Sequence, residues 1–307
     1  MWFKNLQLYR LPAPWNISTE ALSEQLARGV FCPCGNLEAV SRGWTAPRPQ
    51  AAIDELLYVA GHQYLLTLTT ESRLLPSSVI NQETQARAEK IAAEQGYPPG
   101  RKALRDLKEQ IRDELLPRAF VNRRKTLVWI DREHGWLGID TASLTKAEEA
   151  LEHLRQCLDE LPLSLVQTQT SPTSAMADWL ASGDAPAGFT IDRDCELKAV
   201  DDERAAVRYV RHPLSDEAAA EIRAHIAAGK LPTRLALTWD DKISFVLTEK
   251  GEIKRLEFLD VLKESAEQGI DNADEIFDAE FALMTGEFAR FIPALVEALG
   301  GLVAGDK

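Results

Sequence analysis

The sequence of 307 residues is poor in cysteine, in long apolar runs and in net positive charge. Four cysteines are too few for a disulfide framework, which indicates a reducing compartment. No stretch approaches the roughly 18 consecutive apolar residues of a membrane span. No basic leader precedes an apolar run at the start, so we expect neither a signal peptide nor a membrane segment. The net charge of -13 excludes a uniformly basic nucleic-acid binder, but it leaves room for a local basic surface.

Patterns typical of enzymes are also scarce. The segment 96–102 differs from a phosphate-binding loop because three residues, not four, separate its glycines and no hydroxyl residue follows the lysine. Cys32 and Cys34 lack a second pair or a nearby histidine to complete a zinc site. The acidic triplet at 201–203 and the acidic pair at 240–241 could hold Mg²⁺ for a nuclease, although acidic residues at turns are more often solvated turn formers. We expect no enzymatic activity, no cofactor and no metal, and we keep the nuclease as an alternative.

The chain divides into blocks of strands and helices without strict alternation, which predicts the α+β class with antiparallel sheets. Residues 1–76 and 119–165 are predicted to form a central α+β domain. Residues 77–118 are inserted into it as a helical finger, and 166–307 form an α+β base domain that ends in a helix. Within the finger, prolines and glycines at 96–100 separate two helices, at about 80–95 and 101–116. We therefore expect a projecting helical hairpin.

Periodicity predicts the remaining elements. The predicted strands are 3–11, 64–69, 126–131, 136–140, 235–239, 243–248 and 253–258. Helices are expected from Ser18, near 215–228 and along 277–295. A capping box of Thr145 and Glu148 is expected to open another helix, which carries leucines as far as Leu161. Trp44 is placed in a loop, and residues 166–175 are expected to form a polar linker.

The segment 101–125 is the most informative part of the sequence because it holds nine basic and four acidic residues in an acidic chain. Its first half has helical spacing, with a basic stripe beside an apolar one. The apolar stripe would pack on a neighbour and leave the basic stripe open. The basic stripe is Arg101, Arg105, Lys108 and Arg112, and the apolar stripe is Leu104, Leu107, Ile111 and Leu115.

Two interpretations fit this basic stripe. Cations one helical turn apart can follow phosphates and release their counterions. A solvated helix with ion pairs such as Arg105–Glu109 explains the same pattern. Phe120, just after Arg118, also has two interpretations. An aromatic residue there is usually part of a core, but it can also be an exposed contact. The window 266–287 is strongly acidic and has no Lys or Arg, so any DNA must meet another surface.

Segments along nearly the whole chain, in the same order, are similar to the bacterial recombination-associated RdgC family. No single piece is a chemical motif, but their agreement in order is specific. The matching segments include Trp2-Phe3-Lys4-Asn5-Leu6, Tyr9-Arg10-Leu11, Pro33-Cys34-Gly35, Gly43-Trp44, Leu75-Pro76-Ser77, Leu115-Leu116-Pro117-Arg118-Ala119-Phe120, Trp129-Ile130-Asp131, Gly229-Lys230, Lys254-Arg255-Leu256 and Leu283-Met284-Thr285-Gly286-Glu287.

The resemblance implies a non-enzymatic protein that associates with the nucleoid and binds duplex DNA with little sequence preference. It implies a ring-shaped homodimer whose positive central hole encircles DNA and which restrains RecA-promoted recombination. In such a ring the finger reaches the other subunit. Arg118 and Phe120 match a position near the ring's closure, and the facing side maps onto Arg211 and His212. Lys230, in a well-matched Gly-Lys step, is a candidate for the lining.

We therefore expect a dimeric, sequence-nonspecific DNA clamp in the cytoplasm that makes no contact with a membrane. The alternative is a protein-interaction module that touches the recombinase directly, with DNA binding incidental; the acidic, aromatic C-terminal segment supports it. The residues expected to contact phosphates are Arg101, Arg105, Lys108, Arg112, Arg118 and Lys230, and those expected to close the dimer are Phe120, Arg211 and His212.

Overall fold

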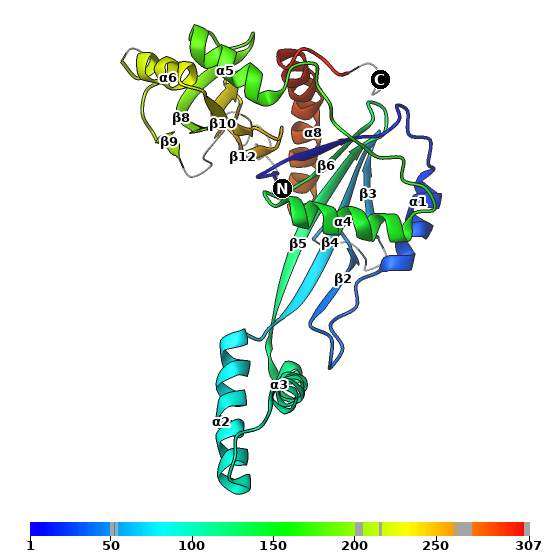
Figure 1. The fold of residues 1–307 in the computed structure, drawn as a ribbon. Helices are drawn as coiled ribbons and strands as arrows, with labels where there is room; N and C mark the ends of the chain where they lie inside the picture. The colour runs from blue at the N-terminus through cyan, green and yellow to red at the C-terminus, as the bar shows by residue number, and fades with distance from the viewer. Residues whose placement is uncertain are drawn as a thin grey trace.

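The computed structural model describes residues 1–49, 52, 55–199, 205–214, 217–260, 262 and 272–303. It is an α+β structure in which two antiparallel sheets lie together at one end and two helices project at the other (Figure 1). None of the helices in this part of the chain has the length and hydropathy that crossing a membrane requires.

The larger sheet has seven strands in the order β2-β4-β5-β6-β1-β7, with β3 also paired to β4. β4 and β5 have twelve residues each and pair along their whole length, from Gln63–Asp131 to Leu74–Phe120. Its strands are β1 (Gln7–Arg10), β2 (Val40–Thr45), β3 (Leu57–Ala60), β4 (Gln63–Leu74), β5 (Phe120–Asp131), β6 (Trp136–Ile139) and β7 (Ser164–Leu165).

Side chains of the central strands are buried on both faces of this sheet, because successive residues of a strand point to opposite sides. Val128 and Ile130 belong to one apolar cluster, whereas Trp129 belongs to the other. The first cluster is covered by α1 (Thr19–Leu26), which continues into the 3-10 turn η1 (Ala27–Gly29), and by α4 (Leu144–Cys157). The second cluster extends into the rest of the molecule.

The smaller sheet has five antiparallel strands in the order β12-β11-β10-β8-β9. Met176, Leu180 and Ile222 from its helices share a core with Leu235 and Leu237 of β10. The elements of this part are α5 (Pro172–Ser182), β8 (Phe189–Ala199), β9 (Ala206–Tyr209), α6 (Glu217–Ala227), β10 (Lys230–Trp239), β11 (Ile243–Thr248) and β12 (Ile253–Phe258).

The long helix α8 (Ala273–Ala298) joins the two sheets. The ring of Phe288 lies 5.1 Å from that of Trp129 in β5 and 5.7 Å from that of Phe258 in β12, measured between centroids. The N-terminal segment makes a second connection, because the amide of Leu6 donates to the Ile253 carbonyl at 2.8 Å. Aromatic burial and backbone pairing therefore hold the sheets together.

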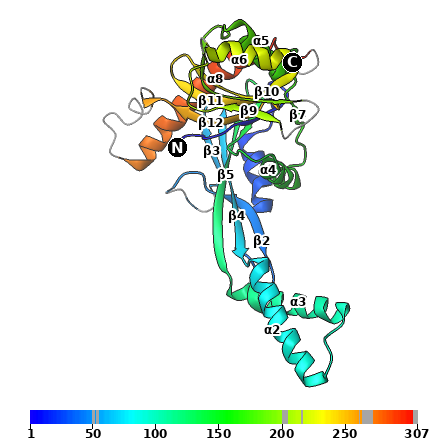
Figure 2. The ribbon, with the colours of Figure 1, turned by 60° about the vertical axis from the view of Figure 1, so that its left-hand side comes forward.

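The projecting helices are α2 (Ser77–Gln95) and α3 (Arg101–Leu115), followed by the short 3-10 turn η2 (Leu116–Arg118). They follow β4 and precede β5, so the two long strands carry them away from both sheets (Figure 2). Gly96 ends α2 with a φ of 82°, a left-handed conformation that glycine adopts without steric cost. Both predicted helices are confirmed within three residues at each end.

Other predictions are wrong in instructive ways. Trp44 lies in β2, not in a loop, and is fully buried, because pairing with β4 brings this short segment into the sheet. The predicted Thr145 capping box does not form: α4 begins at Leu144 without a side-chain cap and ends at Cys157, before Leu161. The expected linker ends early, since Ser171 caps α5 through its hydroxyl. The three strands of the C-terminal meander are confirmed.

Candidate nucleic-acid interface

The two stripes predicted on α3 are both present. The four cations of the basic stripe are exposed, while Ile111 is fully buried and the leucines of the apolar stripe are partly buried. α3 packs its apolar stripe toward α2, where Ile80 and Ala88 are buried. The basic stripe is therefore on the open side of the helix, where phosphates could reach it.

An ion-pair network fixes α3 against α2. Arg87 of α2 binds Glu83 at 3.0 Å and Glu114 of α3 at 2.7 Å. The hydrogen bond from Arg87 lowers the pKa of Glu114. The charges that orient the helix are thus separate from those of the basic stripe.

The solvated-helix interpretation is partly realised. Arg105 and Glu109 are 3.9 Å apart and Arg112 and Asp113 are 3.8 Å apart, and all four side chains are more than half exposed. Exposed pairs of this kind contribute about 0–1 kcal/mol each. Within the described residues, Arg101 and Lys108 have no ion pair. Phosphates could therefore bind this stripe with little loss of existing interactions.

The joint between α3 and β5 exposes both a cation and an aromatic ring. Arg118 is exposed, and Phe120 is 84% exposed. Phe120 pairs in register with Leu74, which is itself 53% exposed, so the two apolar side chains stand side by side on the surface. The interpretation of Phe120 as a core residue is wrong, because the end of β5 lies beyond both apolar cores.

β5 carries further cations beyond this joint. Arg123 is neutralised by Glu71, a buried carboxylate that also accepts the amide of Cys34 at 2.9 Å. The hydrogen bond from Arg123, together with the one from the Cys34 amide, lowers the pKa of Glu71. Arg124 and Lys125, by contrast, are exposed, and no ion pair is formed by either in the part of the chain that the structure describes.

The other candidate residues are on a different part of the molecule. Lys230 begins β10, and its Nζ lies 3.3 Å from Nδ1 of His225. Arg211 and His212 follow β9; the Arg211 amide donates to Asp194 at 2.7 Å, and the His212 ring lies 6.2 Å from that of Tyr209. Figures 1 and 2 place β9, α6 and β10 at the opposite end of the molecule from α3. One chain therefore does not bring these two sets of residues together.

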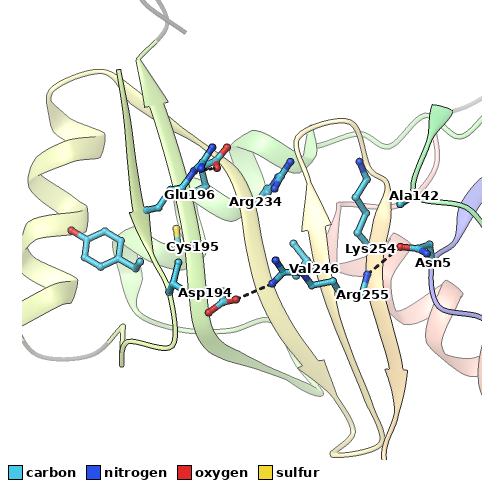
Figure 3. A pocket seen from close by; sticks show the side chains of 12 residues that line it. Asn5, Ala142, Asp194, Cys195, Glu196, Arg234, Val246, Lys254 and Arg255 are labelled. Carbon is cyan, nitrogen blue, oxygen red and sulfur yellow. Dashed lines mark hydrogen bonds and ion pairs between the residues drawn. The ribbon is translucent and has the colours of Figure 1, made fainter. Parts of the chain in front are cut away.

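A groove on the smaller sheet was missed in the sequence (Figure 3). It has a volume of about 360 Å³, and four of its lining residues are cations. They come from β9, β10 and β12. Of these strands, β9 was not predicted and β10 was predicted too short. The available signal was the alternation of Arg234 with the buried Leu235 and Leu237 in β10. The lining cations are Arg208, Arg234, Lys254 and Arg255.

The acidic candidates have local partners. Asp240 binds Lys242, which lowers the pKa of Asp240. In the described ranges no group of three His, Cys, Asp or Glu side chains could hold a metal ion, and the triplet at 201–203 lies outside those ranges. Two acids of the 266–287 window, Asp278 and Glu287, pair with Arg48 and Arg290. Two others, Glu267 and Asp271, lie outside the described residues.

The aromatic residues of the same window are not available to a partner. Phe277 and Phe281 are buried, and both rings contact Tyr58 of β3 edge-to-face. Tyr58 also donates to Asp278 at 2.7 Å; burial and this hydrogen bond raise its pKa to about 12. The acidic, aromatic C-terminal segment supported the alternative of a protein-interaction module. Its aromatic residues Phe277 and Phe281 are thus part of the core.

Fold and surface together define an α+β protein with two antiparallel sheets, a projecting pair of helices and basic surfaces on both parts. The family described as "Putative exonuclease, RdgC" matches residues 1–302. A protein of Dechloromonas aromatica named "Recombination-associated protein RdgC" is 62% identical over 307 residues, which is all of both chains. Proteins of the same name from Cupriavidus pinatubonensis and a Janthinobacterium species are 51% and 50% identical, and each alignment covers at least 98% of both chains. The chain belongs to the RdgC family.

Proposed function

We propose that this protein binds duplex DNA without sequence preference, as a ring-shaped homodimer that encircles the duplex and restrains RecA-promoted recombination. The observation that carries the proposal is the exposed basic stripe of α3. The chain is a member of the RdgC family, and its relatives are named as recombination-associated. Contacts to phosphates position a protein on DNA but carry no sequence information. We assign those contacts to Arg101, Arg105, Lys108, Arg112, Arg118 and Lys230.

The exposed ring of Phe120 supports closure through a second copy. A side chain with 84% of its surface exposed, beside the exposed Leu74, can bury apolar area only against a partner. Arg211 and His212, our candidates for the facing side, belong to the opposite end of the molecule, so a protomer cannot close on itself. In this arrangement residues 77–118 form the finger that reaches the other subunit. Residues 1–76 and 119–165 form the central domain, and residues 166–307 form the base domain. The dimer would act on the nucleoid, without a cofactor and without catalysis.

The test compares retention of the protein on a closed circular duplex and on the same DNA linearised, as salt is raised. Charge contacts weaken equally on both forms, whereas a closed ring can leave only through an end. We expect the circle to retain protein in salt that strips the linear form. If both forms release the protein together, the protein binds one face of the helix and the encircling mechanism is wrong.

The family description favours an exonuclease as a second candidate. End-labelled linear duplex incubated with the protein and Mg²⁺ distinguishes the two: shortened strands would support the nuclease, and full-length strands would support the clamp. Binding to RecA without DNA, at an affinity unaffected by charge changes on α3, would instead favour the protein-interaction module.

A further inference from the structure

The groove on the smaller sheet lies opposite the face on which α5, α6 and α8 pack. In β10 the side chain of Leu235 is fully buried among the helices, so Arg234, one residue earlier, points to the other face. Figure 3 shows Arg234 and Lys254 projecting from their strands on the groove side, with helices behind the sheet. The strand alternation thus places cations over this face.

A row of paired residues crosses the groove. In the strand register, Arg208 of β9 lies opposite Glu196 of β8. Glu196 lies opposite Arg234 of β10, and Arg234 lies opposite Thr248 of β11. Directly opposed side chains in a sheet are about 5 Å apart. The carboxylate of Glu196 therefore lies between two guanidinium groups, and one negative charge faces two positive ones.

The hydrogen bonds of Glu196 come from residues other than Arg234. Its carboxylate accepts hydrogen bonds from Arg208 and from the Thr233 hydroxyl, the latter at 3.0 Å. Burial acts to raise the pKa of Glu196, but these hydrogen bonds and the positive charges of Arg208 and Arg234 outweigh it, and the pKa is lowered. Arg234 is exposed, and in the described ranges no hydrogen bond or ion pair holds its side chain. Its guanidinium donors are therefore available to a ligand.

Arg255 is held over the same groove by an unusual backbone. Its φ is 50°, in the left-handed region, which costs a non-glycine residue about 1–2 kcal/mol. The register of β11 and β12 shifts at this point, and such bulges re-aim side chains. The guanidinium reaches Asp194 at 3.1 Å, and the adjacent Lys254 binds Glu252 at 2.8 Å. Each of these two cations therefore has a carboxylate partner at the groove.

The groove and the hollow that adjoins it carry a local surplus of positive charge in a chain with a net charge of -13. The second hollow shares Glu196, Arg234 and Lys254 with the groove, so the two form one continuous surface. The cations that line the two are Lys198, Arg208, Arg234, Lys250, Lys254 and Arg255, and the carboxylates are Asp194, Glu196, Glu249 and Glu252.

We propose that this groove is a second binding surface for the phosphate backbone of DNA, centred on Arg234. The inference rests on the proposed function, and it adds a contact that is independent of α3. Exposed guanidinium groups suit phosphates, because their donors match two oxygens of one group. Contact with the backbone alone also agrees with binding that has no sequence preference.

The test measures the affinity of a fluorescent duplex of mixed sequence for Arg234→Ala over a range of salt. Loss of one phosphate contact should raise Kd about tenfold at low salt and reduce the slope of log K against log salt by about 0.9. Arg234→Lys keeps the charge and should restore the slope. Lys146→Ala is the matched control, since it removes one exposed cation from α4, and it should leave Kd and the slope unchanged.

The outcomes separate this inference from the proposed function. If the wild-type protein binds duplex and Arg234→Ala has the same Kd and slope, the groove assignment is wrong and DNA binding stands. If the wild-type protein fails to bind duplex even at low salt, both proposals are wrong. If Arg234→Ala loses binding to polyglutamate but keeps its affinity for duplex, the groove is a site for an acidic peptide, and the phosphate assignment is overturned.

Discussion

Arg255 of β12 reaches over the face of the smaller sheet to Asp194 of β8, although β11 and β10 lie between their strands. The distance between Nη1 of Arg255 and Oδ2 of Asp194 is 3.1 Å. The other carboxylate oxygen of Asp194 accepts the backbone amide of Arg211 at 2.7 Å. A single side chain thus links the cationic groove to the segment that we assign to dimer closure.

Replacing Asp194 by Asn should release Arg255 and add one net positive charge to the groove. Because the Arg255 side of the ion pair is 73% exposed, the free energy of unfolding should change by less than about 1 kcal/mol. Affinity for duplex at low salt should become severalfold tighter. Asp159→Asn breaks another exposed Arg–Asp pair, with Arg28, and serves as the control whose DNA affinity stays constant. Equal affinities of the two variants would contradict the role of the groove.

Reversing two unpaired charges of α3 should weaken binding to every sequence. Arg101→Glu with Lys108→Glu removes two phosphate contacts, so the salt slope should fall by roughly two units. The matched variant, Lys146→Glu with Arg155→Glu on α4, makes the same change in net charge. Anisotropy titrations over a range of salt measure both. An equal loss in the two variants would show a general charge effect rather than a site on α3.

Phe120→Ser should separate closure of the ring from folding. The side chain is 84% exposed, so the free energy of unfolding should change by no more than about 0.5 kcal/mol. Salt-resistant retention on circular DNA should be lost, while binding to a short linear duplex is kept. Tyr97→Ser removes another exposed aromatic ring, in the loop between α2 and α3, and should retain the wild-type behaviour. Unchanged retention by Phe120→Ser would contradict the assignment.

Phe288→Ala tests how the two sheets are coupled. Its ring is fully buried against Phe3, against Trp129 of the larger sheet and against Phe258 of the smaller sheet. Removing it should lower the free energy of unfolding by about 3–5 kcal/mol. Denaturant unfolding followed by both fluorescence and circular dichroism should remain one coincident transition, at lower denaturant. Two separated transitions would show that the sheets fold independently.

The pKa of Glu196 predicts an acid dependence of stability. A carboxyl group whose pKa is lower in the folded state than its ordinary value of 4.5 stabilises the fold above that value. This stabilisation is lost as the pH falls from about 4.5 through the lowered pKa. Thermal unfolding should therefore show Glu196→Gln less stable than the wild type at neutral pH, with the difference shrinking below pH 4.5. A difference that stays constant with pH would rule out an ionised Glu196 as the cause.

Local sequence patterns were sufficient for α2, α3, α8 and the C-terminal meander. Helical periodicity and the Pro98-Pro99 break are properties of neighbouring residues, so they can be recognised without a tertiary structure. The same holds for the two stripes of α3. Predictions were wrong or missing where pairing with a distant strand overrode local preference, as for Trp44 in β2 and for the charged strand β8.

The sequence by itself determined the α+β class, the two projecting helices and the basic stripe, because each depends on spacing along one segment. Only the tertiary structure decided that Phe120 is exposed, since this depends on where β5 leaves the core. It also decided the groove, whose Glu196, Arg208, Arg234 and Arg255 come from four strands. Strand order, register and a bulge bring these residues together, and they are set by packing of the whole chain.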